Sequence, residues 1–395
     1  MHLSPEFRSF IQEHISDDTD RLLLVASRFP DIDMPFAVDQ ILARRQIKDK
    51  LPSWYANENL IFPSRLSAEQ CSSEITACYK QGLLAGKTFC DLTGGLGIDT
   101  YYFAQSAEEV HYIERFPEYC KAAKHNFQEL KAENIQVHEA DSRDIISSLK
   151  ADTFYIDPAR RAGCNQRVFA LADCEPDVLQ LKPILLDHAR RLIVKISPMA
   201  DLEETLRLLP ETREIHILSI KNECKELLFI LESGESQPFT KQVCIHAINF
   251  TTQGEKQIFS FHPEEEKIAE LHTGEPGKYL YEPHAALLKS GAFKLIAQRF
   301  NLSKLHKHSH LYSSDTCCED FPGRIFKIDN TYEFSGKLLK QLGKEIPQAN
   351  IAIRNFQLSV AELRKRTHIK EGGEHYLFAT TLASERKVIF LTHKV

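Results

Sequence analysis

Hydrophobic residues recur at helical spacing over residues 1–66. Leu22, Val25 and Phe29 fall on one face of a first stretch, and Pro52 ends a second one. We therefore expect a helical region here, either as a small module of its own or as a cover for the segment that follows. No residue pattern in this region indicates a catalytic or binding function.

A capping pattern of polar residues then predicts the start of a further helix. Ser67 is followed three residues later by Gln70, which is the spacing of a capping box. The spacing predicts a helix that begins at Ser67, runs through Tyr79 and ends near Gly82.

From Lys87 onward, short apolar runs alternate with amphipathic stretches. Strands are predicted at 87–92, 109–114, 135–140, 152–157 and 191–197, and helices at 98–106, 117–131 and 176–189. Such alternation indicates βαβ units and a parallel sheet. Two further strands, 213–220 and 224–232, are too close in the chain for a parallel crossover, so they must form an antiparallel hairpin.

After Gly234 the pattern becomes mixed. A second hairpin is predicted from KQVCIHAINF and KQIFSF, then a helix over 285–300, and then alternating strands and helices of an α+β domain. The predicted regions are a helical N-terminal region (1–66), an α/β domain (67–235), a hairpin-containing region (236–320) and an α+β domain (321–395).

Composition is that of an ordinary globular protein, with 43% hydrophobic and 26% charged residues. The absence of a long apolar run and of a secretory signal predicts a cytoplasmic protein without a membrane partner. The ten cysteines are scattered without a CxxC pair, and LHKHSH (305–310) is interpreted as a solvated loop. No metal is therefore expected.

The net charge of −6 hides an asymmetry. Residues Gly277–Val395 hold 19 Lys and Arg against 11 Asp and Glu, a net charge of +8, so the remainder of the chain carries −14. Segregation of this kind favours a basic region with its own polyanionic partner, although chance drift of surface charge between domains also produces it.

The segment FCDLTGGLGIDT carries the clearest chemical signal. A strand ends at Asp91, a glycine-rich turn follows, and a helix begins near Ile98. Backbone amides in such a turn bind polar or anionic groups, and an acid at the end of the next strand, here Glu114, can reach ribose hydroxyls. Either a dinucleotide or S-adenosylmethionine (AdoMet) would fit. Thr100 stands where the dinucleotide motif needs its third glycine, and Asp91 suits a cationic ligand, so AdoMet is favoured.

These motifs, together with Asp157-Pro158-Ala159-Arg160, resemble those of class I AdoMet-dependent methyltransferases of the D-P-A-R-R group, over about residues 67–232. The resemblance implies an α/β Rossmann-like sheet, mostly parallel with its last strand antiparallel, and AdoMet as the cofactor. It implies a cofactor site made of Asp91, Thr93, Gly94, Gly95, Gly97, Asp99, Glu114, Arg115, Asp141 and Ser142. It implies catalytic roles for Asp157, Pro158 and Arg160. Asp141 and Arg160 are also open to plainer interpretations, as solvated surface and as an ion-pair partner.

A second resemblance covers the C-terminal part. LRKRTHIKEGGEHYLFATTL resembles a THUMP-like domain, and KYLYEPHAALLKSGAF resembles the ferredoxin-like region that precedes it in the same group. Because THUMP domains present RNA to modification enzymes, the resemblance implies an RNA substrate, tRNA or rRNA. The densest basic cluster, Arg364, Lys365, Arg366 and Lys370, is then a candidate RNA contact, with a solvated helix face as the alternative.

The fifth predicted strand, 191–197, limits the choice of the atom that accepts the methyl group. Uridine C5 methyltransferases, whose D-P-x-R motif is similar, need a nucleophilic Cys at its end, where this chain has Ser197. We therefore expect methylation of a base nitrogen. The rival interpretations are an RNA-binding module whose methyltransferase fold has lost catalysis and, less favoured, an NAD-dependent oxidoreductase.

Overall fold

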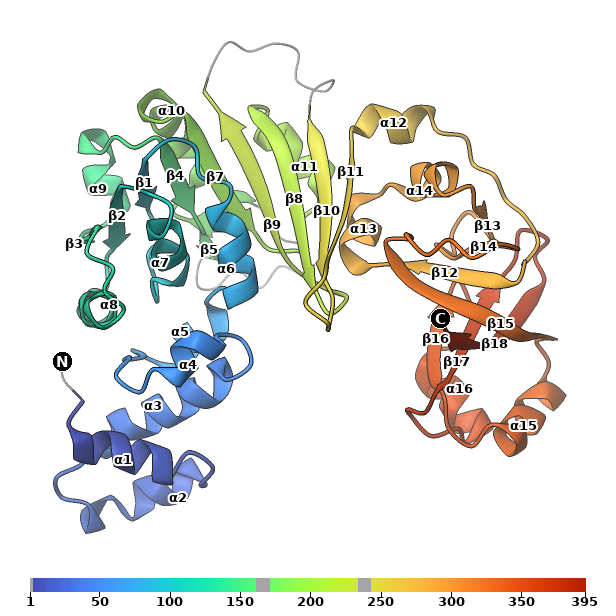
Figure 1. The fold of residues 1–395 in the computed structure, drawn as a ribbon, viewed down its shortest axis with the longest axis horizontal. Coiled ribbons are helices and arrows are strands. Elements are labelled where there is room, and N and C mark those ends of the chain that lie inside the picture. The colour runs from blue at the N-terminus through green and yellow to red at the C-terminus, as the bar shows by residue number, and fades with distance from the viewer. Residues whose placement is uncertain (1–2, 161–170, 234–242) are drawn as a thin grey trace. The chain divides into compact units, whose positions relative to one another are not determined.

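The structure is a computed structural model that describes residues 3–160, 171–233 and 243–395 (Figure 1). Contacts between Cα atoms divide the chain into two compact units. The first comprises Met1–Arg213 and Leu227–Gln237, and the second comprises Glu214–Glu226 and Pro238–Val395. The finer division into four regions stays a prediction. None of the helices in the described ranges is long and apolar enough to cross a membrane.

The N-terminal part of the first unit is helical, as predicted. Its elements are α1 (Pro5–Glu13), α2 (Thr19–Leu24), the 3-10 helix η1 (Ala26–Arg28), α3 (Met34–Ile47) and α4 (Pro52–Ala56). Trp54 is fully buried in an apolar cluster that also contains Leu96 and Ile98 from the glycine-rich segment and Tyr102 from the helix that follows it. The helical region therefore covers the following domain and shares its core.

The predicted helix at Ser67 is wrong in its start and its length. Ser64 is the N-cap of α5 (Arg65–Gln70), and its hydroxyl and backbone exchange the capping-box hydrogen bonds with Ser67. The chain then leaves the helical conformation, and Ser73 caps a separate helix, α6 (Glu74–Gln81). Serines that can cap occur at several positions here, so spacing alone selected the wrong one.

The strands of the first unit form a sheet in the order β9-β7-β4-β1-β2-β3 (Figure 1). Their bounds are β1 (Thr88–Asp91), β2 (Glu109–Glu114), β3 (Ile135–Glu139), β4 (Thr153–Ile156), β7 (Arg191–Ile196) and β9 (Glu223–Glu232). All the pairs are parallel except that of β7 with β9. The predicted fold class, a mostly parallel sheet whose last strand is antiparallel, is confirmed.

Helices connect these strands as the βαβ pattern requires. They are α7 (Ile98–Ala104), α8 (Pro117–Glu129), α9 (Ser142–Ile145), η2 (Ile146–Ser148), η3 (Leu171–Asp173), α10 (Val178–His188) and α11 (Leu202–Leu208). A short antiparallel pair, β5 (Ala159–Arg160) with β6 (Cys174–Glu175), lies between β4 and α10. Because parallel strands place their carboxyl ends at one edge, the ends of β1, β2 and β4 come together.

Two hairpins continue the chain. β8 (Thr212–Ile220) lies next to β9 in the sheet order, and Lys221 and Asn222 turn between them with positive φ angles. In the second unit, β10 (Cys244–Phe250) is antiparallel to β11 (Lys256–Phe261) and parallel to β8. Both predicted hairpins are therefore present.

The rest of the second unit is α+β. A sheet in the order β13-β14-β12-β15-β18-β17-β16 comprises β12 (Tyr279–Pro283), β13 (Ser303–Lys304), β14 (Tyr312–Ser314), β15 (Gly323–Glu333), β16 (Asn350–Arg354), β17 (His375–Thr381) and β18 (Lys387–Lys394). The helices are α12 (Pro263–Ile268), α13 (Ala285–Ser290), α14 (Phe293–Arg299), α15 (Gly336–Glu345) and α16 (Val360–Thr367). The single helix expected over 285–300 is divided at Gly291, whose left-handed conformation ends α13.

Candidate active site

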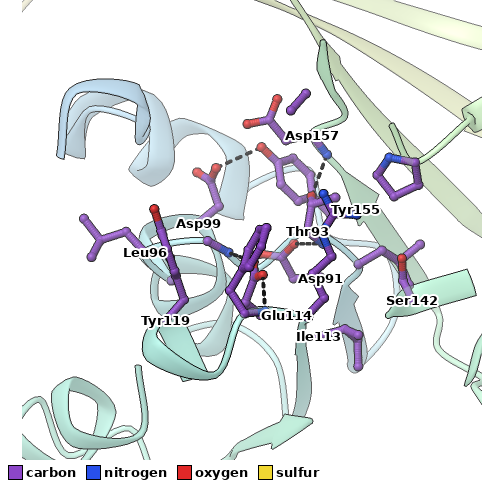
Figure 2. A pocket seen from close by; sticks show the side chains of 18 of the residues that line it. Asp91, Thr93, Leu96, Asp99, Ile113, Glu114, Tyr119, Ser142, Tyr155 and Asp157 are labelled. Carbon is purple, nitrogen blue, oxygen red and sulfur yellow. Dashed lines mark hydrogen bonds between the residues drawn. The ribbon is translucent and has the colours of Figure 1, made fainter. Parts of the chain in front are cut away.

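A cavity of about 590 Å³ lies in the first unit at the carboxyl ends of β1, β2 and β4 (Figure 2). This volume and this place in the sheet are typical of nucleotide-sized ligands. Eleven of the residues named from the sequence line it: Asp91, Thr93, Gly94, Gly95, Gly97, Asp99, Glu114, Arg115, Asp141, Ser142 and Asp157. Their chemical roles stay predictions, but their convergence is a property of the structure.

The glycine-rich turn is held tightly on one side and open on the other. A Cβ atom at Gly94 would lie 2.3 Å from the Tyr112 ring, and one at Gly97 would lie 2.7 Å from the Phe127 ring. Gly97 also has a φ of 82°, which favours glycine. At Gly95, by contrast, a Cβ atom would meet nothing closer than 3.8 Å. A ligand can therefore approach the backbone closely at Gly95.

Glu114, at the end of β2, is fixed by backbone amides. Its Oε2 accepts a hydrogen bond from the Gly95 amide at 3.0 Å, and its Oε1 accepts one from the Phe116 amide at 2.9 Å (Figure 2). A carboxylate retains further acceptor positions beyond these two bonds. Glu114 is thus oriented in the cavity wall and can accept hydrogen bonds from a ligand.

Asp91 is almost fully buried at the end of β1. It accepts hydrogen bonds from the Thr100 hydroxyl at 2.6 Å and from the Thr93 amide at 3.0 Å. Burial raises the pKa of Asp91 to about 7, because the two hydrogen bonds only partly offset the loss of hydration. The charge of this carboxylate is therefore sensitive to pH near neutrality.

Asp99, near the start of α7, is part of a buried network that the sequence did not indicate. Its carboxylate pairs with Lys80 Nζ at 2.8 Å and accepts hydrogen bonds from Ser72 at 2.7 Å and Tyr155 at 2.8 Å. Burial raises the pKa of Asp99, but Lys80 and Lys195 together outweigh it, so that the pKa is lowered overall. Asp99 is thus a charged structural anchor for the cavity wall.

Asp157, at the end of β4, faces the same cavity. Lys195 Nζ lies 2.6 Å from its Oδ2, and its backbone amide donates to the Thr93 hydroxyl at 2.8 Å. Lys195 also lies 3.3 Å from the Ser72 hydroxyl. The sequence signal that could have identified Lys195 is a lysine inside the largely apolar strand RLIVKI. This lysine orients the Asp157 carboxylate.

The two other residues assigned to catalysis are placed differently. Pro158 is buried and does not line the cavity, although its neighbour Ala159 does. Arg160 is in β5, and its side chain lies outside the described part of the structure, as does the whole of Arg161. Of the D-P-A-R segment, Asp157 therefore provides the functional group that the structure describes in the cavity.

Four charged residues of the cavity lining pair with one another. Arg143 binds Asp141 through Nε at 2.9 Å and Nη2 at 2.6 Å, which lowers the pKa of Asp141. Arg115 and Arg143 both pair with Glu175, at 3.1 and 3.2 Å. The predicted residues Arg115 and Asp141 are therefore linked by Arg143 and Glu175, which had not been predicted.

The predicted basic cluster is in the second unit, on and after α16. Lys365, Arg366 and Lys370 are exposed. Arg364 is half-buried, and its guanidinium donates to the Ile369 and Ala349 carbonyls at 3.1 and 3.3 Å. Lys365, Arg366 and Lys370 are available to a polyanion. Arg364 instead holds the end of the helix against adjacent segments of the same chain.

A solved structure matches almost the whole chain. A protein from Porphyromonas gingivalis W83, provisionally described as a methyltransferase, is 40% identical with a TM-score of 0.88, over 99% of this chain and 98% of that one. The chain belongs to the class I methyltransferase family. Family models also match this methyltransferase at its C-terminus: a ferredoxin-like domain at residues 279–322 and a THUMP-like domain at 323–394. The expected family and its C-terminal regions are confirmed.

Other likenesses to the methyltransferase are weak. An rRNA methylase from Streptococcus thermophilus matches with 14% identity and a TM-score of 0.31, over 42% of this chain and 99% of that one. A Streptococcus mutans protein in complex with SAH, provisionally described as a methyltransferase, matches with 14% identity and a TM-score of 0.31, over 40% and 96%. Neither likeness bears on function. No curated protein matches the chain.

Proposed function

We propose that this methyltransferase uses AdoMet to methylate a base nitrogen of RNA, either tRNA or rRNA. The observation that carries the proposal is the single cavity in which the glycine turn, Glu114, Asp91 and the Lys195–Asp157 pair meet. The same cavity is thus lined by groups that can bind a nucleoside and by a carboxylate, that of Asp157, that can interact with a reacting amine.

The cavity walls suit AdoMet group by group. The open side of Gly95 admits the methionine part to the backbone, and Asp91 supplies negative charge near its cationic groups. Glu114 can accept hydrogen bonds from the ribose hydroxyls, and the Asp141–Ser142 turn, which also lines the cavity, is the part that we assign to the adenine. When bound, AdoMet supplies an electrophilic methyl group. The chain's part is to position both reactants.

Asp157 is the residue that we propose acts on the acceptor. A carboxylate that accepts a hydrogen bond from an amine N–H aligns the nitrogen lone pair with the methyl group, and it can take the proton that the methylated amine loses. Lys195 fixes the orientation of this carboxylate at 2.6 Å. The Asp157 backbone amide also donates to the Thr93 hydroxyl, and Lys195 Nζ bonds the Ser72 hydroxyl, so both residues are tied to other residues of the cavity lining.

A pyrimidine C5 acceptor is less compatible with this cavity. That chemistry needs a thiolate that adds to the base. Among the described lining residues, Cys71 supplies a thiol, but burial raises its pKa, and the thiol donates a hydrogen bond to the Ala68 carbonyl. Ser197 follows β7, where the resemblance to uridine C5 methyltransferases would require a cysteine. These observations favour a base nitrogen.

Asp91 makes AdoMet binding depend on pH. A cationic ligand prefers the ionised carboxylate, so binding below the Asp91 pKa of about 7 must release a proton. We expect AdoMet affinity to fall by up to about tenfold per pH unit below neutrality and to level off above it. Calorimetry in buffers of different ionisation enthalpy measures both the affinity and the released proton. Constant affinity from about pH 6 to 8 without proton release would refute the role given to Asp91.

RNA binding is assigned to the basic C-terminal region. Replacing both Lys365 and Arg366 with glutamine is expected to weaken RNA binding roughly fivefold to tenfold and to reduce the salt dependence by the equivalent of about two phosphate contacts. Lys337 and Lys340 are exposed lysines on α15, so the same double change there is the matched control. Filter binding at several salt concentrations measures the effect. Equal losses in the two double variants would argue against α16 as the contact surface.

Calorimetry with AdoMet tests the proposed function at its first step. We expect one molecule to bind per chain. No binding at millimolar AdoMet would contradict the proposal and would favour an RNA-binding module without catalysis.

A further inference from the structure

Three side chains with metal-binding atoms converge in the second unit, on the adjacent strands β8 and β10. Glu214 and His216 are two residues apart on β8, so they point to the same face of the sheet. His246 on β10 is the partner of His216 in the parallel register. One ligand atom from each residue lies within 4.8 Å of the others.

The distances between these atoms suit a small divalent cation. Glu214 Oε2 lies 3.0 Å from His216 Nε2 and 3.7 Å from His246 Nε2. Ligands bound tetrahedrally to Zn²⁺ at about 2.0–2.1 Å lie about 3.3 Å from one another. These two distances bracket that value. Small side-chain rotations would therefore bring the three atoms into a metal's coordination sphere.

The surroundings hold the histidines in place. The two imidazole rings are stacked, with centroids 4.6 Å apart and an interplanar angle of 23°. His246 Nδ1 lies 2.7 Å from the Ser260 hydroxyl on β11, which leaves Nε2 facing Glu214. Metal-binding histidines commonly have such a partner on the nitrogen that does not bind the metal. His216 is almost fully buried, so its orientation is fixed by packing.

We infer that Glu214, His216 and His246 form a site for a divalent transition-metal ion, with Zn²⁺ as its best match. Two imidazoles and one carboxylate suit Zn²⁺ far better than Ca²⁺ or Mg²⁺, which prefer oxygen ligands alone. Three protein ligands leave the fourth position of a tetrahedral ion to water. This site departs from the expectation that the protein binds no metal, and it is independent of methyl transfer.

The test uses the full-length protein, freed of metal with a chelator and titrated with Zn²⁺. We expect one tight Zn²⁺ per chain. His216→Gln and His246→Gln should each weaken it at least about 100-fold, since loss of an outer-shell partner alone costs 10- to 100-fold. His375→Gln is the control, because His375 is exposed on β17, and it should leave the tight site intact.

Co²⁺ provides a readout that does not depend on the variants' folding. Bound at this site in the wild-type protein, Co²⁺ should show the intense visible absorption of tetrahedral coordination, and Zn²⁺ should displace it. Weak octahedral absorption alone, or Zn²⁺ binding that is equal in the wild type and in both cluster variants, would overturn the inference and leave the cluster as a hydrogen-bonded group.

Discussion

Replacing Asp157 with alanine is expected to lower the rate of methyl transfer by about 10³-fold and to leave AdoMet affinity within about twofold of the wild type. Asp157 lines the cavity and bonds Lys195 at 2.6 Å, and in the proposed function it faces the acceptor. Its loss removes the acceptor for the amine proton, but the glycine turn and Glu114 keep their contacts. Single-turnover transfer from labelled AdoMet, with AdoMet affinity measured by calorimetry, separates the two effects.

Two further variants sharpen this result. Asp157→Asn keeps one oxygen but loses the charge that pairs with Lys195, so its rate should fall between those of the wild type and the alanine variant. Asp187→Ala is the control, because Asp187 is a highly exposed aspartate on α10 outside the cavity. If Asp157→Ala lost AdoMet binding in proportion to its rate, Asp157 would belong to the cofactor site, and the assigned role would be wrong.

Replacing Glu114 with glutamine is expected to weaken AdoMet binding by about 10- to 100-fold, because hydrogen bonds to a charged group contribute about 1.5–3 kcal/mol. The carboxylate is oriented by the Gly95 and Phe116 amides, so it is prepared to accept two ribose hydroxyl bonds. Glutamine keeps the size of the side chain and one acceptor oxygen. Calorimetric titration with AdoMet measures the change.

The matched control for Glu114 is Glu139→Gln. Glu139 on β3 is the partner of Glu114 in the parallel register, but it does not line the cavity. Its replacement should leave AdoMet affinity unchanged. Should Glu114→Gln bind AdoMet as tightly as the Glu139 variant, the ribose contact would have to be assigned elsewhere.

The central sheet was predictable because its strands are short apolar runs between polar turns. The run 109–114 coincides with β2, and 152–157 contains β4. Their order along the chain fixes which carboxyl ends meet, so the placement of Asp91, Glu114 and Asp157 around one cavity followed from local pattern. The helix start at Ser67 failed because Ser64 offers the same capping chemistry three residues earlier.

Contacts between strands distant in sequence could not be predicted in the same way. Lys195 meets Asp157 only because β4 and β7 are neighbours, and His216 meets His246 only because β10 adds in parallel beside β8. Arg364 belonged to an apparently uniform basic cluster, but folding places its guanidinium against backbone carbonyls. Side chains whose partners depend on tertiary pairing carry no periodic signal in the sequence.

The most direct test of the account is methyl transfer itself. The purified protein would be incubated with AdoMet labelled in its methyl group and with RNA from cells that lack the gene, and the modified nucleoside would be identified by mass spectrometry. We predict label on a base nitrogen of tRNA or rRNA, and none with Asp157→Ala. Label that appears in no RNA, although the protein binds AdoMet, would contradict the proposal that RNA is the substrate.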